Sequence, residues 1–380
     1  MDIRRTDESW LPETPAAPKL SLYFQVSAAL LFLGIYVSID FNFQKGGTVP
    51  MVSAMPGLFL ILLYRGLASP RLARFALFPA GVVAAFGLVA PKLSTMFLNR
   101  AASVAQVAYA MIICYAVNWT LQRLGADRLY RILKWLIPIY LSLLVIEILS
   151  HPLQDLINAY NDAVFFAVDL DSLANRDAAL GGYRPKFFTS EPSFVAITVM
   201  ILITAYIWSG KGIARYFWAV FYTAVALVII RSPIVVFALI TIFVTMVTDK
   251  LLAKYRVALF IGVSIAATLA VIAALTFESD AIQNRISGVA NNEDYSTIFR
   301  TYGAADVAIN IVKKYPLFGA GPGGLDLVKY EIIDTEIKLG VPISAVEASW
   351  KISIANAPSS LLSSFGIIGF ITGIWLLIIL

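Results

Sequence analysis

Apolar stretches of membrane-spanning length alternate with short polar connections along this 380-residue chain. An α-helix needs roughly 20 mostly apolar residues to cross a bilayer. The pattern therefore predicts an all-α polytopic membrane protein of about ten or more transmembrane helices. The expected spans lie near 21–39, 51–64, 73–90, 101–120, 133–149, 193–209, 214–230, 232–248, 256–276 and 359–380. Because the chain stops within apolar sequence, the last span either ends the protein or is cut short.

The basic residues of the short connections give the orientation. Lys and Arg concentrate in the connections on the cytoplasmic side of a membrane. With residues 1–20 as a cytoplasmic tail, the inside connections hold Arg65, Arg71, Arg74, Arg123, Arg128, Arg131, Lys134, Lys211, Arg215, Lys250, Lys254 and Arg256, whereas the short outside connections hold Lys45, Lys92, Arg100 and Arg231. We expect helices over 21–149 and 193–276, two long outward loops over 150–192 and 277–358, and a last helix over 359–380.

Composition supports the membrane class and excludes several others. Hydrophobic residues make up 59%, charged residues 14%, and the mean hydropathy is +0.79, far from the balance of a soluble domain. The formal charge is +5, but the Lys and Arg residues concentrate in the connections on one side of the membrane, so the charge does not indicate nucleic-acid binding. A lone Cys114 allows no intramolecular disulfide or cysteine metal site, and a lone His151 allows no histidine cluster. We predict no cofactor.

Helical patterns also occur inside the two outward loops. The first loop carries apolar residues at helical spacing, which predicts an amphipathic helix along the membrane surface: Leu153, Leu156, Ile157, Tyr160, Val164 and Val168. In the second loop, Asp294 or Ser296 can cap a helix that runs to about Lys314 and ends at Pro316.

Three arginines are candidates for binding an anion at the outer face. Arg231 lies between two apolar spans, Arg300 lies in the second loop, and Arg184 precedes the next span. The guanidinium fork suits phosphate oxygens bidentately, so two outward arginines can clamp a pyrophosphate. Arg231 can equally be a snorkelling residue at a helix end, and Arg300 an ordinary surface residue. Glu191 can be a catalytic carboxylate or simply cap the following span.

Weaker motifs have simpler interpretations. The run Gly319-Ala320-Gly321-Pro322-Gly323-Gly324 matches G-x-G-x-x-G, but a proline and not a strand precedes it, so we interpret it as a turn that positions the loop. Asp169-Leu170-Asp171 resembles a metal-binding D-x-D, although a solvated loop is the commoner explanation. His151 can act as a general base or sit at the membrane interface.

Several of these residues form an ordered series that resembles the O-antigen polymerase/O-antigen ligase family of bacterial membrane glycosyltransferases. The series is Arg184 with Glu191-Pro192, then Arg231-Ser232, Arg300, Pro316-Leu317-Phe318-Gly319-Ala320-Gly321-Pro322-Gly323 and Phe365-Gly366-Ile367-Ile368-Gly369. The resemblance covers about half of the chain, from Arg184 onward. Glu191-Pro192-Ser193 resembles the exopolysaccharide branch of the family.

The resemblance implies a metal-independent C-type glycosyltransferase in the bacterial inner membrane, active at the periplasmic face. Its donor is an undecaprenyl-pyrophosphate-linked glycan and its acceptor a lipid-linked glycan, with a chain-length regulator or other assembly proteins as further partners. By position, Arg231 and Arg300 match the arginines that contact the donor pyrophosphate. Arg184, Arg285 and Tyr302 complete the candidate set for substrate binding.

One departure separates this chain from the ligases. Where ligase-type members carry His-Asn, the sequence is Ile354-Ala355-Asn356-Ala357-Pro358, and Ala355 cannot act as a base. Glu191, Glu347 or Asn356 with a water remain as candidates. The sequence therefore favours a polysaccharide polymerase, with an O-antigen ligase as the alternative. A lipid-linked oligosaccharide flippase is the rival from another class, although transporters usually carry polar groups near the membrane midplane.

Overall fold

The structure is a computed structural model. It describes residues 21–37, 39, 41–42, 48–49, 51–65, 70–164, 183–189, 191–249, 262, 302–343, 346–347, 350, 354 and 357–379. Several predictions fall outside these residues: the tail 1–20, Asp169 and Asp171, the span 256–276, Arg285, the helix start at 294–301 with Arg300, and Ala355 with Asn356.

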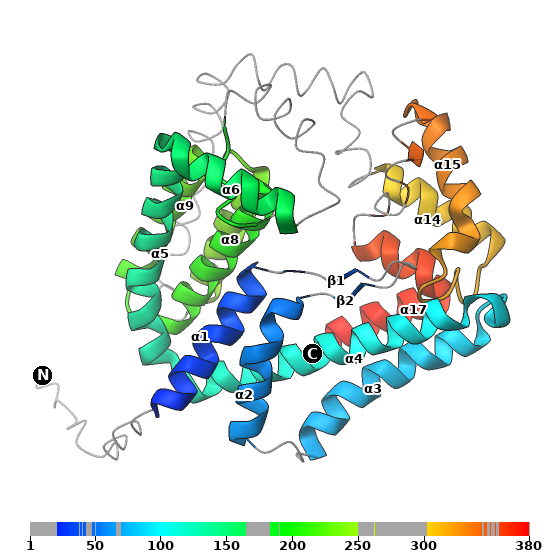
Figure 1. The fold of residues 1–380 in the computed structure, drawn as a ribbon, viewed down its shortest axis with the longest axis horizontal. Helices are drawn as coiled ribbons and strands as arrows, with labels where there is room; N and C mark the ends of the chain where they lie inside the picture. Colours follow the sequence, from blue (N-terminus) through cyan, green and yellow to red (C-terminus); the bar gives the residue numbers. More distant parts are fainter. Residues whose placement is uncertain are drawn as a thin grey trace, which may run out of the picture.

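The N-terminal helices pack in pairs. Helices α1 (Leu22–Val37) and α2 (Met55–Arg65) contact each other, as do α3 (Pro70–Val89) and α4 (Leu93–Leu124). A short antiparallel pair, β1 (Phe41–Asn42) and β2 (Thr48–Val49), and a 3-10 turn, η1 (Val52–Ala54), connect α1 to α2 (Figure 1). Buried residues of α1, α2 and α4 form one apolar core, with Phe24 and Leu31 fully buried.

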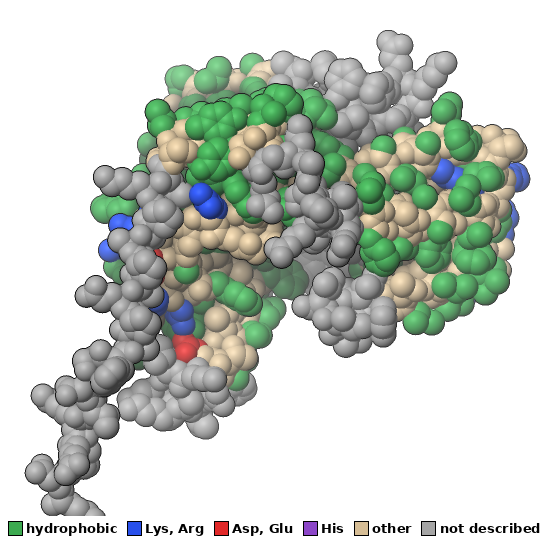
Figure 2. All heavy atoms as spheres, turned by 90° about the horizontal axis from the view of Figure 1, so that it is seen from below, with side chains coloured by type: hydrophobic (Ala, Val, Ile, Leu, Met, Phe, Trp, Pro, Cys, Tyr) green, Lys and Arg blue, Asp and Glu red, His purple; other side chains and the backbone are tan. Residues whose placement is uncertain are grey.

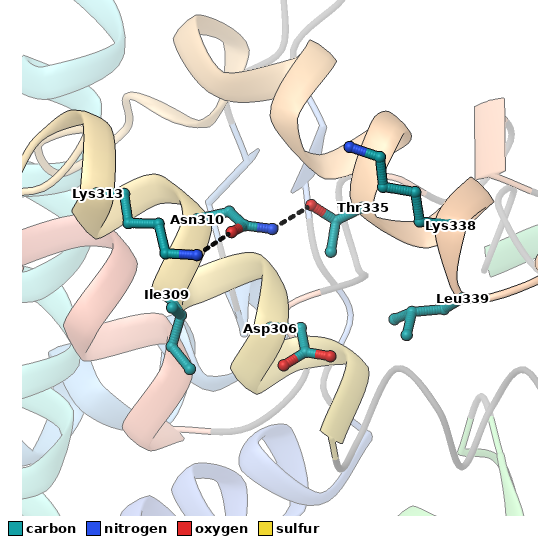
Figure 3. Close-up of a pocket in the computed structure, with 7 residues that line it drawn as sticks. All are labelled: Asp306, Ile309, Asn310, Lys313, Thr335, Lys338 and Leu339. Carbon is teal, nitrogen blue, oxygen red and sulfur yellow. Dashed lines mark hydrogen bonds between the residues drawn. The ribbon is translucent and has the colours of Figure 1, made fainter.

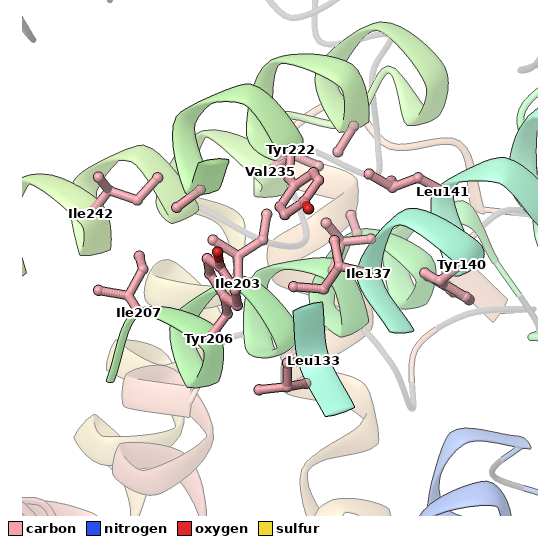
Figure 4. Close-up of a cluster of buried hydrophobic side chains, with 14 of the residues drawn as sticks. Leu133, Ile137, Tyr140, Leu141, Ile203, Tyr206, Ile207, Tyr222, Val235 and Ile242 are labelled. Atoms are coloured by element: carbon pink, nitrogen blue, oxygen red, sulfur yellow. The ribbon is translucent and has the colours of Figure 1, made fainter. Parts of the chain in front are cut away.

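A second bundle follows in the chain. It contains α5 (Ala126–Leu149), α8 (Pro192–Ser209), α9 (Ala214–Ile230), η2 (Pro233–Val235) and α10 (Val236–Thr248). Their facing sides form the largest apolar core, in which Ile137, Ile203 and Tyr206 interlock (Figure 4). The amphipathic helix expected in the first outer loop is present as α6 (His151–Val164), with Ile157 fully buried and Leu156 exposed. It lies across one end of this bundle (Figure 1).

The C-terminal part contains α14 (Tyr302–Lys314), η4 (Leu325–Val328), α15 (Lys329–Lys338) and α17 (Ala357–Ile379). Helix α14 ends at Lys314, just before Pro316, as the sequence predicts. Both α15 and α17 pack against α14. Helix α17 breaks at Gly366, whose φ of 63° and ψ of −164° lie in a region that favours glycine.

The glycine-rich run fills this break. The N–H of Ile367 donates to the carbonyl of Pro316 at 3.0 Å, and the N–H of Ala320 donates to Ser363 at 2.8 Å. A Cβ on Gly366 would lie 2.5 Å from the Leu317 carbonyl oxygen. The run is therefore a turn, as predicted, and its glycines allow close packing of backbone on backbone.

Arg100 differs from its predicted place in an outer connection. It lies within α4, is only 3% exposed, and donates to three carbonyls at the end of α3, those of Gly87, Ala90 and Pro91. A cation there complements the negative end of the helix dipole and satisfies carbonyls that have no helical partner. The apolar pattern does not predict this role, because α4 begins earlier, at Leu93, than the pattern indicates.

The described surface fits a membrane environment. Large apolar side chains are exposed on the bundle, among them Trp135, Trp208 and Phe217 at 68–74% exposure. Figure 2 shows hydrophobic side chains over much of one face, with few charged groups between them. Such a surface is unfavourable in water and favourable in lipid.

Among the described residues, three helices are long and apolar enough to cross a membrane: Leu93–Leu124, Ala126–Leu149 and Pro192–Ser209. Shorter apolar helices cover Leu22–Val37, Val52–Tyr64, Leu77–Val89, Ala214–Ile230, Val236–Thr248 and Pro358–Gly373. Every predicted span within the described residues is helical. The chain is a helical membrane protein, and the count of ten spans stays a prediction.

Candidate functional site

Polar and charged residues gather at one end of the second bundle. Helices α5 and α9 finish there, at Leu149 and Ile230, while α8 starts there at Pro192. Arg231 directly follows α9, and the segment 183–189 leads into α8. Helix α6 lies across this end (Figure 1). We call it the α6 end of the bundle.

Glu147 forms the centre of the α6 end. Its side chain is fully buried, and its two carboxylate oxygens accept three hydrogen bonds. The donors are the Tyr183 hydroxyl at 2.6 Å, the Lys186 N–H at 2.8 Å and the Phe187 N–H at 3.0 Å. A buried carboxylate is costly unless it is bonded in this way. Glu147 therefore ties the segment 183–189 to the end of α5.

This segment has an unusual backbone. Phe187 and Phe188 both have positive φ, 34° and 63°, which costs of order 1–2 kcal/mol for a residue with a Cβ. The consecutive N–H groups of Lys186 and Phe187 point at one carboxylate, an arrangement that typically binds anions. Glu147 is thus the anion that holds the strained turn in place.

Helix α1 is attached at the same place. The Tyr36 hydroxyl donates to the Phe187 carbonyl at 2.7 Å and lies 2.9 Å from the Tyr140 hydroxyl. The three aromatic rings also pack edge to face or tilted, with centroids 5.7–6.4 Å apart. The α6 end is therefore held by α1, α5 and the segment before α8 together.

Three cationic side chains belong to this end. Arg184 is 7% exposed and Lys186 is 4% exposed, and the Lys186 ammonium interacts electrostatically with Glu147. Arg231 is half-buried and occupies the left-handed C-cap position of α9, with φ 51° and ψ 42°. The structure thus brings the predicted Arg184 and Arg231 to the same end of one bundle.

Glu191 occupies the N-cap position of α8, as the simpler interpretation expected. Its side chain does not bond the helix N–H groups; instead it accepts a hydrogen bond from the Ser193 hydroxyl at 3.0 Å. It is half-buried. Its greater exposure than that of the fully buried Glu147 makes its carboxylate the better candidate for proton transfer.

The inner face of α6 adds neutral polar groups. Gln154 donates to the last carbonyls of α5, those of Glu147 and Ile148. Asn158 and Asn161 follow on the same face, and Asn161 is 1% exposed. Burial raises the pKa of the Tyr160 hydroxyl, and its ring packs on Phe188 with centroids 5.2 Å apart. The phenol therefore stays neutral, and α6 directly contacts the strained turn.

A separate pocket lies between α14 and α15, with a cavity volume of about 240 Å³. Five of its seven lining residues are polar or charged, and the Asn310 amide links Thr335 at 3.0 Å to Lys313 at 3.2 Å (Figure 3). The lining residues are Asp306, Ile309, Asn310, Lys313, Thr335, Lys338 and Leu339. Tyr302, predicted to contact substrate, is 41% exposed and lies one turn before Asp306.

The remaining predicted residues are scattered. His151 is the exposed first residue of α6, and Glu347 is an exposed residue of helical backbone between α15 and α17. Within the described part of the chain, no three His, Cys, Asp or Glu residues are placed to hold a metal ion. Glu147 is absent from the residues predicted to form the site. The signal for it in the sequence is an acidic residue inside an apolar span.

Comparison with known proteins adds nothing to this picture, since no family model, curated protein or solved structure matches the chain. The fold defines the class, a helical membrane protein with a buried polar site at one end of a helix bundle.

Proposed function

We propose that the protein is a polysaccharide polymerase of the bacterial inner membrane. It joins glycan repeat units from undecaprenyl-pyrophosphate donors to a lipid-linked acceptor glycan at the periplasmic face. The observation that carries the proposal is the gathering of Arg184, Lys186 and Arg231 at the α6 end of a bundle whose core is apolar. Cations at one end of a bundle suit a ligand with an apolar tail in the membrane and an anionic head at its surface.

The reaction is a displacement at the donor's anomeric carbon. An acceptor hydroxyl oxygen bonds to that carbon, the bond from carbon to phosphate oxygen breaks, and its electron pair leaves with undecaprenyl pyrophosphate. Negative charge grows on the leaving group, so Arg231 and Arg300 stabilise the transition state more than the ground state. Arg184, Arg285 and Tyr302 contact the donor or the growing glycan.

The hydroxyl proton needs an acceptor. Glu191 is the first choice because it is half-buried at the α6 end, where it directly precedes α8 and accepts a hydrogen bond from the Ser193 hydroxyl. Glu147 is a poor base because three donors already surround its carboxylate. Its role is to position the segment that carries Arg184 and Lys186. Asn356 with a water is the alternative acceptor.

The break in helix α17 gives little support to the flippase alternative. Transporters use breaks in membrane helices to expose backbone groups to substrates and ions. At Gly366 the freed N–H groups of Ile367 and Ile368 donate to the carbonyls of Pro316 and Leu317, at 3.0 and 3.3 Å. A break whose groups are already bonded to the protein does not need a transported ligand. An O-antigen ligase remains the nearer alternative. It differs from a polymerase in the acceptor that it uses.

The test is an assay of purified protein with a polyprenyl-pyrophosphate-linked repeat unit, with and without a chelator. Wild type, Arg231→Ala and Arg300→Ala are compared on a gel. Arg123→Ala is the control, because Arg123 is exposed at the end of α4, where α5 begins. We expect a ladder of longer glycans that the chelator does not affect, that the control retains, and that both arginine variants lose.

Other outcomes separate the alternatives. Transfer of one glycan to lipid A-core without a ladder would identify a ligase. No ladder from the native repeat unit, together with movement of the lipid-linked glycan across a vesicle membrane, would replace the enzyme proposal with a flippase.

A further inference from the structure

The inner face of α6 carries buried amides that the fold itself does not use. Gln154, Ile157, Asn158 and Asn161 lie at helical spacing on this face. Gln154 has a structural role at the end of α5, and Ile157 is fully buried. In contrast, both polar atoms of the Asn161 side chain and the Oδ1 of Asn158 are buried without a hydrogen-bond partner among the described residues.

These unpartnered atoms need an explanation. A buried polar atom without a hydrogen bond destabilises the folded state, so native structures nearly always supply a partner in the protein, a water or a ligand. Leu or Ile on this face would pack against the bundle at no such cost. Polar residues at these positions therefore point to a bound molecule.

Helix α6 contacts the segment that carries two of the cationic residues of the α6 end. Tyr160, the residue before Asn161, packs its ring on Phe188 with centroids 5.2 Å apart. Phe188 belongs to the segment that carries Arg184 and Lys186. A ligand that reaches the amides therefore lies beside the candidate pyrophosphate-binding residues.

The chemistry of the unpartnered atoms selects the ligand. Two carbonyl oxygens, of Asn158 and Asn161, require donors, and the Asn161 NH₂ requires acceptors. An ionised phosphate offers acceptors alone and would leave both oxygens unpartnered. A sugar hydroxyl both donates and accepts, so adjacent hydroxyls can satisfy all three atoms. A buried water has the same capacity and is the competing occupant.

We propose that the inner face of α6 is the wall of a sugar-binding site, in which Asn158 and Asn161 bond hydroxyls of the glycan next to the lipid pyrophosphate. The inference rests on the proposed function for the identity of that glycan. Such a site also determines substrate specificity, because paired donors and acceptors strongly reject a sugar that lacks the matching hydroxyl.

The test combines stability, binding and turnover in Asn161→Leu, Asn161→Ala and Asn158→Leu. The control is Asn118→Leu, since Asn118 is exposed on α4. The first readout is the melting temperature in detergent without ligand. We expect Asn161→Leu to melt at or above the wild-type temperature, by up to about 4 °C, because an unpartnered buried amide is removed. Asn161→Ala covers the case in which leucine is too large.

The second readout is the rise in melting temperature that a ligand causes. The probes are undecaprenyl pyrophosphate and the same lipid carrying one repeat unit. In wild type the glycan should add stabilisation beyond that of the bare lipid, and in the Asn161 variants this increment should vanish. In the polymerisation assay KM for the donor should rise about 10–100-fold, with kcat changed less than about threefold.

Each contrary result is informative. If both Asn161 variants melt more than about 4 °C below wild type, the amide has a structural role and the inference is wrong. If both Asn161 variants are stable but keep the wild-type KM and the extra rise in melting temperature that the glycan causes, water alone occupies the amides. That result also overturns the proposed sugar site. If wild type forms no polymer yet shows an increment that Asn161→Leu removes, the sugar site stands and the polymerase proposal fails.

Discussion

The two ends of the α5–α8–α9–α10 bundle use polar residues in opposite ways. At the end where α9 begins, Arg215 and Asp249 form an ion pair whose side chains are 13% and 11% exposed. The Tyr216 hydroxyl donates to Asp249 at 2.8 Å, and the Arg215 guanidinium also donates to the carbonyls of Ile207 and Gly210. Only the Nε of Arg215 lacks a partner among the described residues.

The α6 end lies about 25 Å away along the 17-residue α9 and has different features. Its buried carboxylate accepts hydrogen bonds from backbone N–H groups and a hydroxyl, and two aromatic residues are held at positive φ. The Oδ1 of Asn158 and both side-chain polar atoms of Asn161 have no hydrogen-bond partner among the described residues. At the end where α9 begins, Arg215 and Asp249 pair with each other, so these charged side chains stabilise the fold. Strain and unused hydrogen-bonding capacity at the other end are typical of a binding site.

The largest effect on stability should come from Asp249→Ala. The change leaves the Arg215 guanidinium without its carboxylate in a mostly buried place, which costs about 3 kcal/mol of unfolding free energy. The melting temperature in detergent should fall clearly, while polymerisation per folded molecule is retained. Loss of activity at an unchanged melting temperature would mean that the end where α9 begins takes part in function, which would contradict the difference between the two ends.

Arg231→Gly should have the largest effect on activity. Arg231 already has a left-handed backbone, which glycine adopts without strain, so stability should change by less than about 1 kcal/mol. Polymerisation should fall about 100-fold, since one charged stabiliser of the leaving group is lost.

Met51→Gly is the matched control for that variant. Met51 also has a positive φ, 53°, outside a helix, but carries no charge. Its rate should match wild type. Equal activity of the Arg231 variant and wild type would exclude Arg231 from the site.

Glu147→Gln should destabilise the protein by about 1–2 kcal/mol, because the amide NH₂ that replaces one oxygen cannot accept from an N–H. Polymerisation should fall as well, since the turn that carries Arg184 and Lys186 is released. Glu191→Gln is the same chemical change at a half-buried residue bonded to Ser193, and it should lower the rate without lowering the melting temperature. Unchanged melting of Glu147→Gln would show that Glu147 does not hold the turn.

Lys211→Met should have the smallest effect. Lys211 pairs with Asp127 at 3.0 Å, but both side chains are more than 70% exposed. Exposed pairs contribute at most about 1 kcal/mol and often nothing measurable, so the melting temperature should change little. A loss above about 1 kcal/mol would mean that this surface pair, too, helps to close the end where α9 begins.

Much of the secondary structure was predictable, because long apolar stretches and helix-ending prolines are local signals. The end of α14 at Lys314 and the amphipathic α6 are examples. The start of α4 and the place of Arg100 were not, because Arg100 is stabilised by carbonyls of α3 that only packing brings near it. Arg184, Arg231 and Glu191 could be selected as candidates, whereas Glu147 was overlooked.

By itself the sequence determined a helical membrane protein and a turn at the glycine-rich run, and it selected Arg184 and Arg231 as candidates. These follow from hydropathy and backbone chemistry, which depend on neighbours along the chain. Only the tertiary structure decided that Glu147 binds the N–H groups of Lys186 and Phe187, about 40 residues away, and that the turn at 316–320 fills the break at Gly366. It also decided that the Oδ1 of Asn158 and both side-chain polar atoms of Asn161 are buried without a hydrogen-bond partner among the described residues. The reason is physical: hydrogen bonding and burial depend on which distant segments meet, and no local pattern records that.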